Sequence, residues 1–348
     1  MIRKEILYRR AIVGSLRPLV DLKNYRIAHC DPLWMQPPSP PPLSADVFLI
    51  ICGFGSQRYQ LAANRLAAQA RGLGRFTEIL VFTDLSNVPG LSPARRIEIE
   101  ELAKRHPRGW GLWSWKPAVV SAVMNGLPEG VEVFYVDAGC EISPWGEALF
   151  DRWRCHLQTH GNLFFSIPYL EREWTTPAVL RYFALPYDLD SLQVQATWFA
   201  LLNLPAGRIL IERWAVACLH DGGRLLQVTE EDENKYLIEH REDQSVLSCL
   251  IRSQGAFTIL PHADHFLPEL YLPNSWILRM PIHTLRLTGS RSFLETLLKR
   301  SSDLQTIFES TSIFNKLEYL MLKVRRTVFE FTYYPYRVLR ELKRVFLA

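Results

Sequence analysis

Residues 108–144 read RGWGLWSWKPAVVSAVMNGLPEGVEVFYVDAGCEISP, and this is the most informative stretch of the chain. Its first ten residues hold three tryptophans, two glycines and a Lys–Pro pair. A short helix is then expected from Ala118 to Met124, followed by an apolar strand from Val131 to Val136 that ends at Asp137. In an open α/β sheet, ligands bind outside the carboxyl ends of the strands. Asp137 therefore marks the expected position of a functional site.

The sequence before and after this stretch continues the alternation of apolar strands and helices. Before it, the pattern predicts a strand from Asp46, a helix over 59–70 stopped by Gly72, a strand over 76–83 and a helix over 93–105 capped by Ser92. After it, the pattern predicts strands over 162–168, 197–202 and 257–260 and helices over 209–219 and 243–253. This alternation indicates the α/β class, with a mixed, mainly parallel sheet flanked by helices.

The composition is that of a folded globular protein. The chain has 348 residues, of which 48% are hydrophobic and 22% charged, and this excludes a disordered chain. Six cysteines are scattered without a CxxC pair, which favours a reduced, cytoplasmic protein. No apolar run reaches the roughly 18 residues of a membrane span, and no secretory signal is evident.

The chain divides into three expected regions. Residues 1–44 form an irregular leader that closes with a proline-rich spacer, 45–290 form the α/β domain, and 291–348 form a basic amphipathic helical tail. Residues 316–348 hold eight Lys or Arg and three Glu, whereas the whole chain has a net charge of +4. Such a tail can lie on the inner-membrane surface, or it can pack on the body with its basic face in solvent. The near-neutral body argues against nucleic acid as a partner.

Three segments carry candidate chemistry. Asp137 can hold a divalent cation that bridges a diphosphate, or it can only cap the next turn. Lys116, with Trp113 and Trp115 nearby, can bind an anion at a helix start, or this segment can be a hydrophobic loop docked on the core. The HREDQS segment at 240–245 can contact a ligand or serve only as a helix cap.

In this order, the three segments resemble a family of bacterial glycosyltransferase-like proteins with the GT-A fold. The motifs of that family read approximately RGxGxWxWKP, YxDAGxxI and HRxDQSxxSxL. This chain has RGWGLWSWKP at 108–117, YVDAGCEI at 135–142 and HREDQSVLSCL at 240–250. The resemblance covers about residues 46–290 and implies a GT-A-like sheet and a nucleotide-sugar-dependent glycosyltransferase.

The resemblance also implies roles for individual residues. Asp137 corresponds to the first acid of the DXD element that binds metal and nucleotide diphosphate, whereas Gly139 takes the place of the second acid. Glu141 is then the candidate for the second ligand of a Mn²⁺ or Mg²⁺ ion. Asp243 and Gln244 match an acidic–amide pair beside the transferred sugar, and with Asp137 they are the expected catalytic residues. The expected donor-binding residues are Lys116, Trp113, Trp115, Gly139, His240, Arg241, Asp84, Gly53 and Arg58.

The implied reaction moves a sugar from a nucleotide-diphosphate donor, with a UDP-sugar expected first, to a glycan or lipid-linked acceptor. The expected setting is bacterial surface polysaccharide synthesis, in the cytoplasm or on the cytoplasmic face of the membrane. Because the second acid is missing, a non-catalytic module that binds nucleotide or glycan stays open as an alternative. A nucleotidyltransferase on a similar sheet is a further alternative.

Overall fold

The computed structural model describes residues 45–144, 146–187, 189–232, 236–261, 281–284 and 288–290. The expected leader and tail lie outside these residues. The described helices are α3 (Gln57–Leu73), α4 (Pro93–Arg105), α5 (Gly109–Leu112), α6 (Trp115–Gly126), α7 (Glu147–His160), α8 (Glu171–Trp174), α9 (Pro177–Tyr182), α10 (Pro205–Leu219) and α11 (Glu242–Gln254). The described strands are β1 (Val47–Cys52), β2 (Glu78–Phe82), β3 (Glu132–Val136), β4 (Glu141–Ile142), β5 (Asn162–Leu170), β6 (Leu192–Val194), β7 (Trp198–Leu202), β8 (Ile259–Pro261) and β9 (Ile282–His283). Short 3₁₀ turns cover Leu85–Asn87, His220–Leu226 and Glu230–Asp232.

Within the described residues, seven strands form one mixed sheet in the order β2-β1-β3-β7-β5-β6, with β8 paired to β5. Strands β1, β2 and β3 are parallel, and β7 is antiparallel to both β3 and β5. Strand β8 is parallel to β5, so that β2, β1, β3, β5 and β8 run one way and β7 and β6 the other. The expected mixed, mainly parallel sheet flanked by helices is confirmed.

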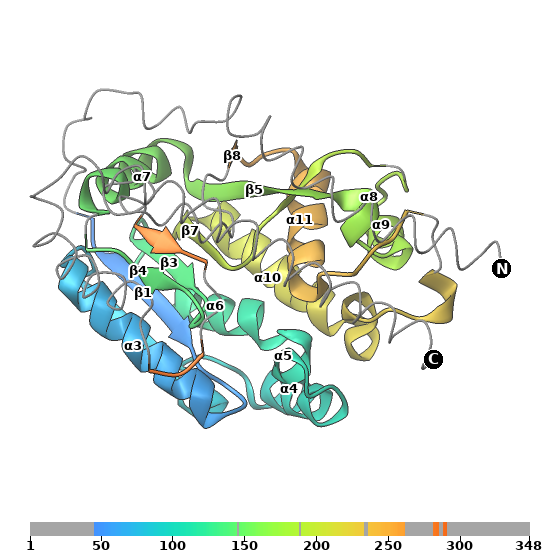
Figure 1. Ribbon diagram of the computed structural model, residues 1–348, viewed down its shortest axis with the longest axis horizontal. Helices are drawn as coiled ribbons and strands as arrows, with labels where there is room; N and C mark the ends of the chain where they lie inside the picture. The colour runs from blue at the N-terminus through green and yellow to red at the C-terminus, as the bar shows by residue number, and fades with distance from the viewer. Residues whose placement is uncertain are drawn as a thin grey trace, which may run out of the picture.

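Helices cover both faces of this sheet because its strands are apolar on both faces (Figure 1). In β1, Phe48, Ile50 and Cys52 pack against one layer, which includes residues of α4, α6, α10 and α11. Val47, Leu49 and Ile51 face the other layer, which includes α3 and α7. The side chains of successive strand residues alternate between the faces, and a strand buried on both faces therefore reads as a continuous apolar run. The core consists of these two clusters, one on each side of the sheet.

Several element boundaries differ from the expected ones. Helix α3 ends at Leu73 and is not stopped by Gly72, because it is Gly74 that adopts the left-handed conformation (φ 65°) that closes the helix. Helix α6 begins at Trp115 and not at Ala118, which places Lys116 inside its first turn, since a proline is tolerated there. Helix α4 runs from Pro93 to Arg105 as expected, and the Ser92 hydroxyl accepts a hydrogen bond from the Arg95 amide at 3.3 Å.

The edge of the sheet that carries Asp137 lies where β1 and β3 end. Because β7 runs against β3, its first residues lie at the same edge, and the Asp137 amide donates to the Thr197 carbonyl at 2.8 Å. Residues that follow β1 and β3 and residues that precede β7 therefore converge. None of the described helices is long and apolar enough to cross a membrane.

Candidate active site

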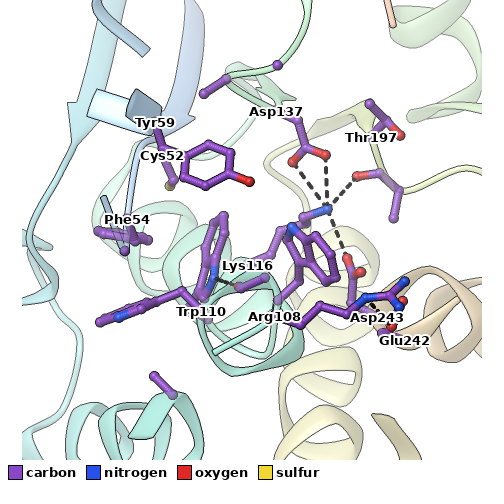
Figure 2. Close-up of a pocket in the computed structure, with 18 of the residues that line it drawn as sticks. Cys52, Phe54, Tyr59, Arg108, Trp110, Lys116, Asp137, Thr197, Glu242 and Asp243 are labelled. Atoms are coloured by element: carbon purple, nitrogen blue, oxygen red, sulfur yellow. Dashed lines mark hydrogen bonds and ion pairs between the residues drawn. The ribbon is translucent and has the colours of Figure 1, made fainter. Parts of the chain in front are cut away.

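A cavity of about 650 Å³ opens at this edge of the sheet, a volume that suits a small-molecule ligand. Its lining comes from the loop after β1, the segment 107–116, the loop after β3, the residues before β7 and the start of α11. Figure 2 shows side chains from these segments pointing toward one another around Lys116. The cavity therefore joins the three sequence motifs in one place.

Lys116 lies at the centre of an ion cluster on the floor of the cavity (Figure 2). Its Nζ atom lies 3.2 Å from Asp137 Oδ1, 3.4 Å from Asp137 Oδ2 and 2.9 Å from Asp243 Oδ2. The same ammonium donates a hydrogen bond to the Ala196 carbonyl oxygen at 3.1 Å. The Lys116 side chain is 3% exposed and that of Asp243 is 7% exposed, whereas that of Asp137 keeps 25% of its surface open. Asp137 is thus the member of the cluster that a ligand reaches most easily.

Two further groups fix the position of Asp137. The buried Tyr135 hydroxyl donates to Asp137 Oδ1 at 2.6 Å. Arg65, which reaches over from α3, donates to the carbonyl oxygens of Ala138 and Cys140 at 3.1 and 3.0 Å. The loop after β3 is therefore tied to α3, and the Asp137 carboxylate is held before any ligand arrives.

Burial and charge pairing shift the pKa values of Lys116 and Asp243 in opposite directions. Burial raises the pKa of Asp243 to about 6, although the Lys116 ammonium pulls this pKa down. Burial alone would lower the pKa of Lys116, but the charges of Asp137 and Asp243 outweigh it and raise this pKa above its ordinary value. Lys116 therefore remains an ammonium at physiological pH, and the charge of Asp243 changes at a pH of about 6.

Aromatic side chains form one wall of the cavity. Phe54, which follows β1, packs against Trp110 at a ring-centroid distance of 5.3 Å and meets Trp115 edge-on at 4.9 Å. The Trp115 indole nitrogen donates to the Gly109 carbonyl at 3.0 Å, which fixes the ring. Trp113 also lines the cavity, and such faces suit stacking against a sugar or a base.

The backbone that carries these tryptophans is strained. Trp110, Leu112 and Trp113 have φ angles of 51°, 56° and 59°, in the left-handed region that side chains with a Cβ rarely adopt. Residues in such conformations cost free energy and persist only where surrounding contacts hold them. The contacts of Trp110 and Trp115 with Phe54 are among those that hold this loop against the body.

We expect Gly109→Ala to disturb this wall. A Cβ atom at Gly109 would lie 2.3 Å from the Trp113 ring, and the residue has a φ of 60°. The free energy of unfolding should fall by about 2 kcal/mol, since the ring must move and the backbone is strained. Urea unfolding monitored by tryptophan fluorescence measures this. Gly126→Ala, which meets nothing within 4 Å, is the control and should be neutral or slightly stabilising; equal losses in both variants would contradict the proposed contact.

Glu242 and Arg108 form an ion pair at the rim of the cavity. Arg108 Nε lies 3.0 Å from Glu242 Oε1, and Nη2 of the same arginine lies 3.3 Å from Glu239 Oε1. Glu242 has a φ of 38°, a left-handed conformation at the start of α11. Burial raises the pKa of Glu242 to about 7, and Arg108 only partly offsets this. A carboxyl group with such a pKa can exchange a proton near neutral pH.

We expect Glu242→Gln to change how stability depends on pH. Because burial raises the pKa of Glu242, the folded protein binds this proton more tightly than the unfolded chain does. The contribution of Glu242 to the free energy of unfolding of the wild type should thus fall as the pH rises from about 4.5 to about 7. The variant lacks this loss, so it should match the wild type near pH 4.5 and exceed it by at most about 3 kcal/mol at pH 8.

Urea unfolding at several pH values between these limits tests this expectation. Glu98→Gln, which changes an exposed residue of α4, is the matched control and should show no comparable pH dependence. A difference between Glu242→Gln and the wild type that stays constant over this pH range would contradict the raised pKa.

Eight of the expected site residues line the cavity. They are Lys116, Trp113, Trp115, Asp137, Gly139, Arg241, Asp243 and Gln244. Asp243 does not cap α11, because its carboxylate contacts Lys116 and the helix begins after Arg241. Gln244 is held by the Ala196 amide, which donates to its Oε1 at 3.4 Å, and by Gln193. Arg241 stacks its guanidinium over Trp174, 4.5 Å from the ring centroid.

Three other expected donor-binding residues do not line the cavity. Gly53 lets α3 approach β1, because a Cβ atom there would lie 2.6 Å from the Tyr59 carbonyl oxygen. Arg58 donates to the Thr288 hydroxyl at 2.9 Å, and Thr288 lines the cavity. The carboxylate of Asp84 accepts a hydrogen bond from the Ser86 amide at 2.8 Å and caps a 3₁₀ turn. Each of these three residues therefore has a packing or hydrogen-bonding role in the fold.

His240 is buried away from the cavity. Its Nε2 donates to the Leu225 carbonyl at 2.9 Å, and its Nδ1 accepts from the Thr176 amide at 3.3 Å. Burial lowers its pKa to about 4, so the ring is neutral and braces the chain before α11. This arrangement does not place His240 where it can touch a donor in the cavity.

The residues expected to hold a metal ion are not brought together. Glu141 is fully buried in β4, 3.8 Å from Arg65 Nε, and does not line the cavity. The described residues contain no group of three or more His, Cys, Asp or Glu side chains that could hold a metal ion. Asp137 and Asp243 share the Lys116 ammonium between them, so these two acids do not fit a divalent cation.

Several lining residues were not expected from the sequence. Glu242 and Arg108 line the cavity and belong to the quoted motifs, as Asp243 and Lys116 do. Their charge and their place in these motifs could have predicted them as site residues. Trp110 was visible as the third tryptophan of its segment. Ala196 and Thr197 had no such signal, because they reach the cavity only through the antiparallel pairing of β7 with β3.

Comparisons with known proteins give partial likenesses in structure. No protein-family model and no curated protein sequence matches this chain. Mouse xyloside xylosyltransferase 1, in its apo form, is 11% identical, with a TM-score of 0.33 over 69% of this chain and 97% of that protein. Galactosyltransferase LgtC, in complex with donor and acceptor sugar analogs, is 13% identical, with a TM-score of 0.34 over 69% of this chain and 84% of that protein.

Proposed function

We propose that this chain transfers a sugar from a nucleotide-diphosphate donor, with a UDP-sugar as the first candidate, to a hydroxyl group of a glycan or lipid-linked acceptor. The observation that carries the proposal is the joint position of Lys116, Asp137 and Asp243 beside an aromatic wall in one cavity. Cationic groups favour a diphosphate, carboxylates favour sugar hydroxyls, and tryptophan faces favour a ring. One cavity thus offers partners for each part of a nucleotide-sugar.

The proposed reaction assigns a task to each of these groups. The acceptor oxygen forms a bond to the anomeric carbon, and the bond from that carbon to the diphosphate oxygen breaks. Its electron pair leaves with the nucleoside diphosphate, whose charge Lys116 and Arg108 counter. The acceptor proton passes to Glu242, which lines the cavity and whose pKa lies near 7. Asp243 and Gln244 hold the transferred sugar at the start of α11.

A non-catalytic module that binds nucleotide or glycan is the second candidate. It is favoured by the pairing of Asp243 with Lys116 at 2.9 Å, since a carboxylate so held is less able to act on a ligand. Binding of UDP or of sugars is expected of this candidate as well, but turnover is not.

Calorimetric titration of the full chain with UDP and with GDP, followed by assays of a panel of nucleotide-sugars, separates the candidates. Binding of a nucleoside diphosphate together with transfer or slow hydrolysis of one nucleotide-sugar supports the transferase. Binding without any turnover favours the module. If no nucleotide binds, both the transferase and the nucleotidyltransferase alternative are excluded.

A further inference from the structure

The Lys116 ammonium fills a position that a cation shared by two carboxylates would take. Four oxygen atoms surround its Nζ atom within 3.4 Å: both carboxylate oxygens of Asp137, one of Asp243 and the Ala196 carbonyl. Such an oxygen cage is the kind of environment that a hard divalent cation prefers. Here a covalently attached positive charge occupies its centre (Figure 2).

Among the residues that the structure describes, no group of three or more His, Cys, Asp or Glu side chains offers a second place for a divalent ion. Gly139 has no side chain to contribute, and the Glu141 carboxylate is fully buried and lies 3.8 Å from Arg65. Both oxygens of Asp137 lie within 3.4 Å of Lys116, so an ion bound to Asp137 would lie close to the ammonium. Repulsion between like charges at such distances in a partly buried site is strong.

We propose that Lys116 is a resident cation that takes the place of a divalent metal, so that this cavity binds its nucleoside diphosphate without metal. The inference rests on the proposed function, since it concerns the diphosphate of the same donor. Lys116 supplies a fixed charge at the floor of the cavity, and Arg108, whose side chain is 56% exposed, supplies a movable one at the rim. The ammonium keeps its proton because its pKa is raised by the two acids around it.

Calorimetry of UDP binding to the full chain, in excess EDTA and in excess Mn²⁺, tests the proposal. The dissociation constant should differ by less than about threefold between the two conditions. An increase in affinity of more than about tenfold in Mn²⁺ would overturn the inference and leave the proposed function standing. Absence of binding of both UDP and GDP in the two conditions would overturn the proposed function and the inference with it.

A second measurement needs no variant and no nucleotide. The electron paramagnetic resonance signal of free Mn²⁺ should stay unchanged when the wild-type protein is added, because the cage is already filled. Loss of that signal at stoichiometric protein would mean that the chain holds Mn²⁺, and the inference would be wrong.

The Lys116→Ala variant should bind UDP in a way that depends on Mn²⁺, unlike the wild type. With the ammonium gone, Asp137 and Asp243 lack their cation, so UDP affinity in EDTA should fall by about tenfold or more and Mn²⁺ should recover part of it. Lys104→Ala, which removes an exposed lysine of α4, is the matched control and should bind UDP as the wild type does. A folded Lys116→Ala protein with unchanged UDP affinity in EDTA would overturn the role of Lys116. If the variant does not fold, the calorimetry and the Mn²⁺ titration of the wild type still test whether the cavity binds its nucleotide without metal.

Discussion

Asp137→Asn is expected to lower kcat/KM for nucleotide-sugar turnover by about 100-fold or more. Asparagine keeps the shape of the side chain but has no charge, so a donor hydroxyl loses a charge-assisted acceptor and Lys116 loses one of its two carboxylate partners. Asp137 is the most exposed acid of the cluster, which makes it the carboxylate that meets the ligand. Steady-state kinetics with the donor identified in the panel measures the effect.

The same variant should keep its fold. With both acids ionised, the cluster of Lys116, Asp137 and Asp243 has one negative charge in excess, and Asp137→Asn leaves a neutral Lys116–Asp243 pair. The pKa of Asp243 should fall below its value of about 6, because the charge of Asp137 helps to raise it. A downward shift of that titration, followed by carboxyl NMR signals, separates loss of charge from loss of structure.

Glu101→Gln, which changes an exposed acid on α4, is the control for this variant. It should leave both kcat/KM and the pKa of Asp243 as they are in the wild type. Turnover by Asp137→Asn within about threefold of the wild type would contradict the assignment of the site to Asp137.

The part of the fold that follows from local chemistry could be predicted from the sequence. Ser92 and Pro93 determine the start of α4, and the continuous apolar run of β1 indicates a strand buried on both faces. The end of α3 was less predictable, since Gly72 was expected to stop the helix but Gly74 closes it. The directions of β7 and β5 could not be read at all, because an apolar strand has the same pattern in parallel and antiparallel sheets.

The candidate site was predictable as a set of residues but not as an arrangement. Lys116, Asp137 and Asp243 were each recognisable from a motif, yet residues 116 and 243 meet only because α6 and α11 both start at the same edge of the sheet. Glu141 illustrates the opposite case. It follows Asp137 closely in the sequence, but β4 carries it to Arg65 and away from the cavity. Sequence spacing alone cannot distinguish these outcomes, because side-chain direction depends on tertiary packing.

Lys116→Met is expected to lower the free energy of unfolding by about 3 to 5 kcal/mol at neutral pH. Methionine has room along the buried path of the lysine stem but carries no charge. Asp137 and Asp243 then lack their shared cation, and Asp243 is almost fully buried. The loss should shrink at pH 5, where protonation of Asp243 removes a buried negative charge, and urea unfolding at both pH values measures it.

The double variant Lys116→Met/Asp243→Asn identifies the origin of that loss. It removes the buried acid together with its partner and leaves only Asp137, which water can reach. The loss should therefore fall to about 1 to 2 kcal/mol, so that the two substitutions are strongly non-additive. Lys104→Met, at an exposed position of α4, should stay within about 0.5 kcal/mol of the wild type. If Lys116→Met is no less stable than this control, or if Asp243→Asn does not rescue it, the ammonium does not balance the two acids. In that case the electrostatic basis of both the transferase site and its independence of metal would be lost.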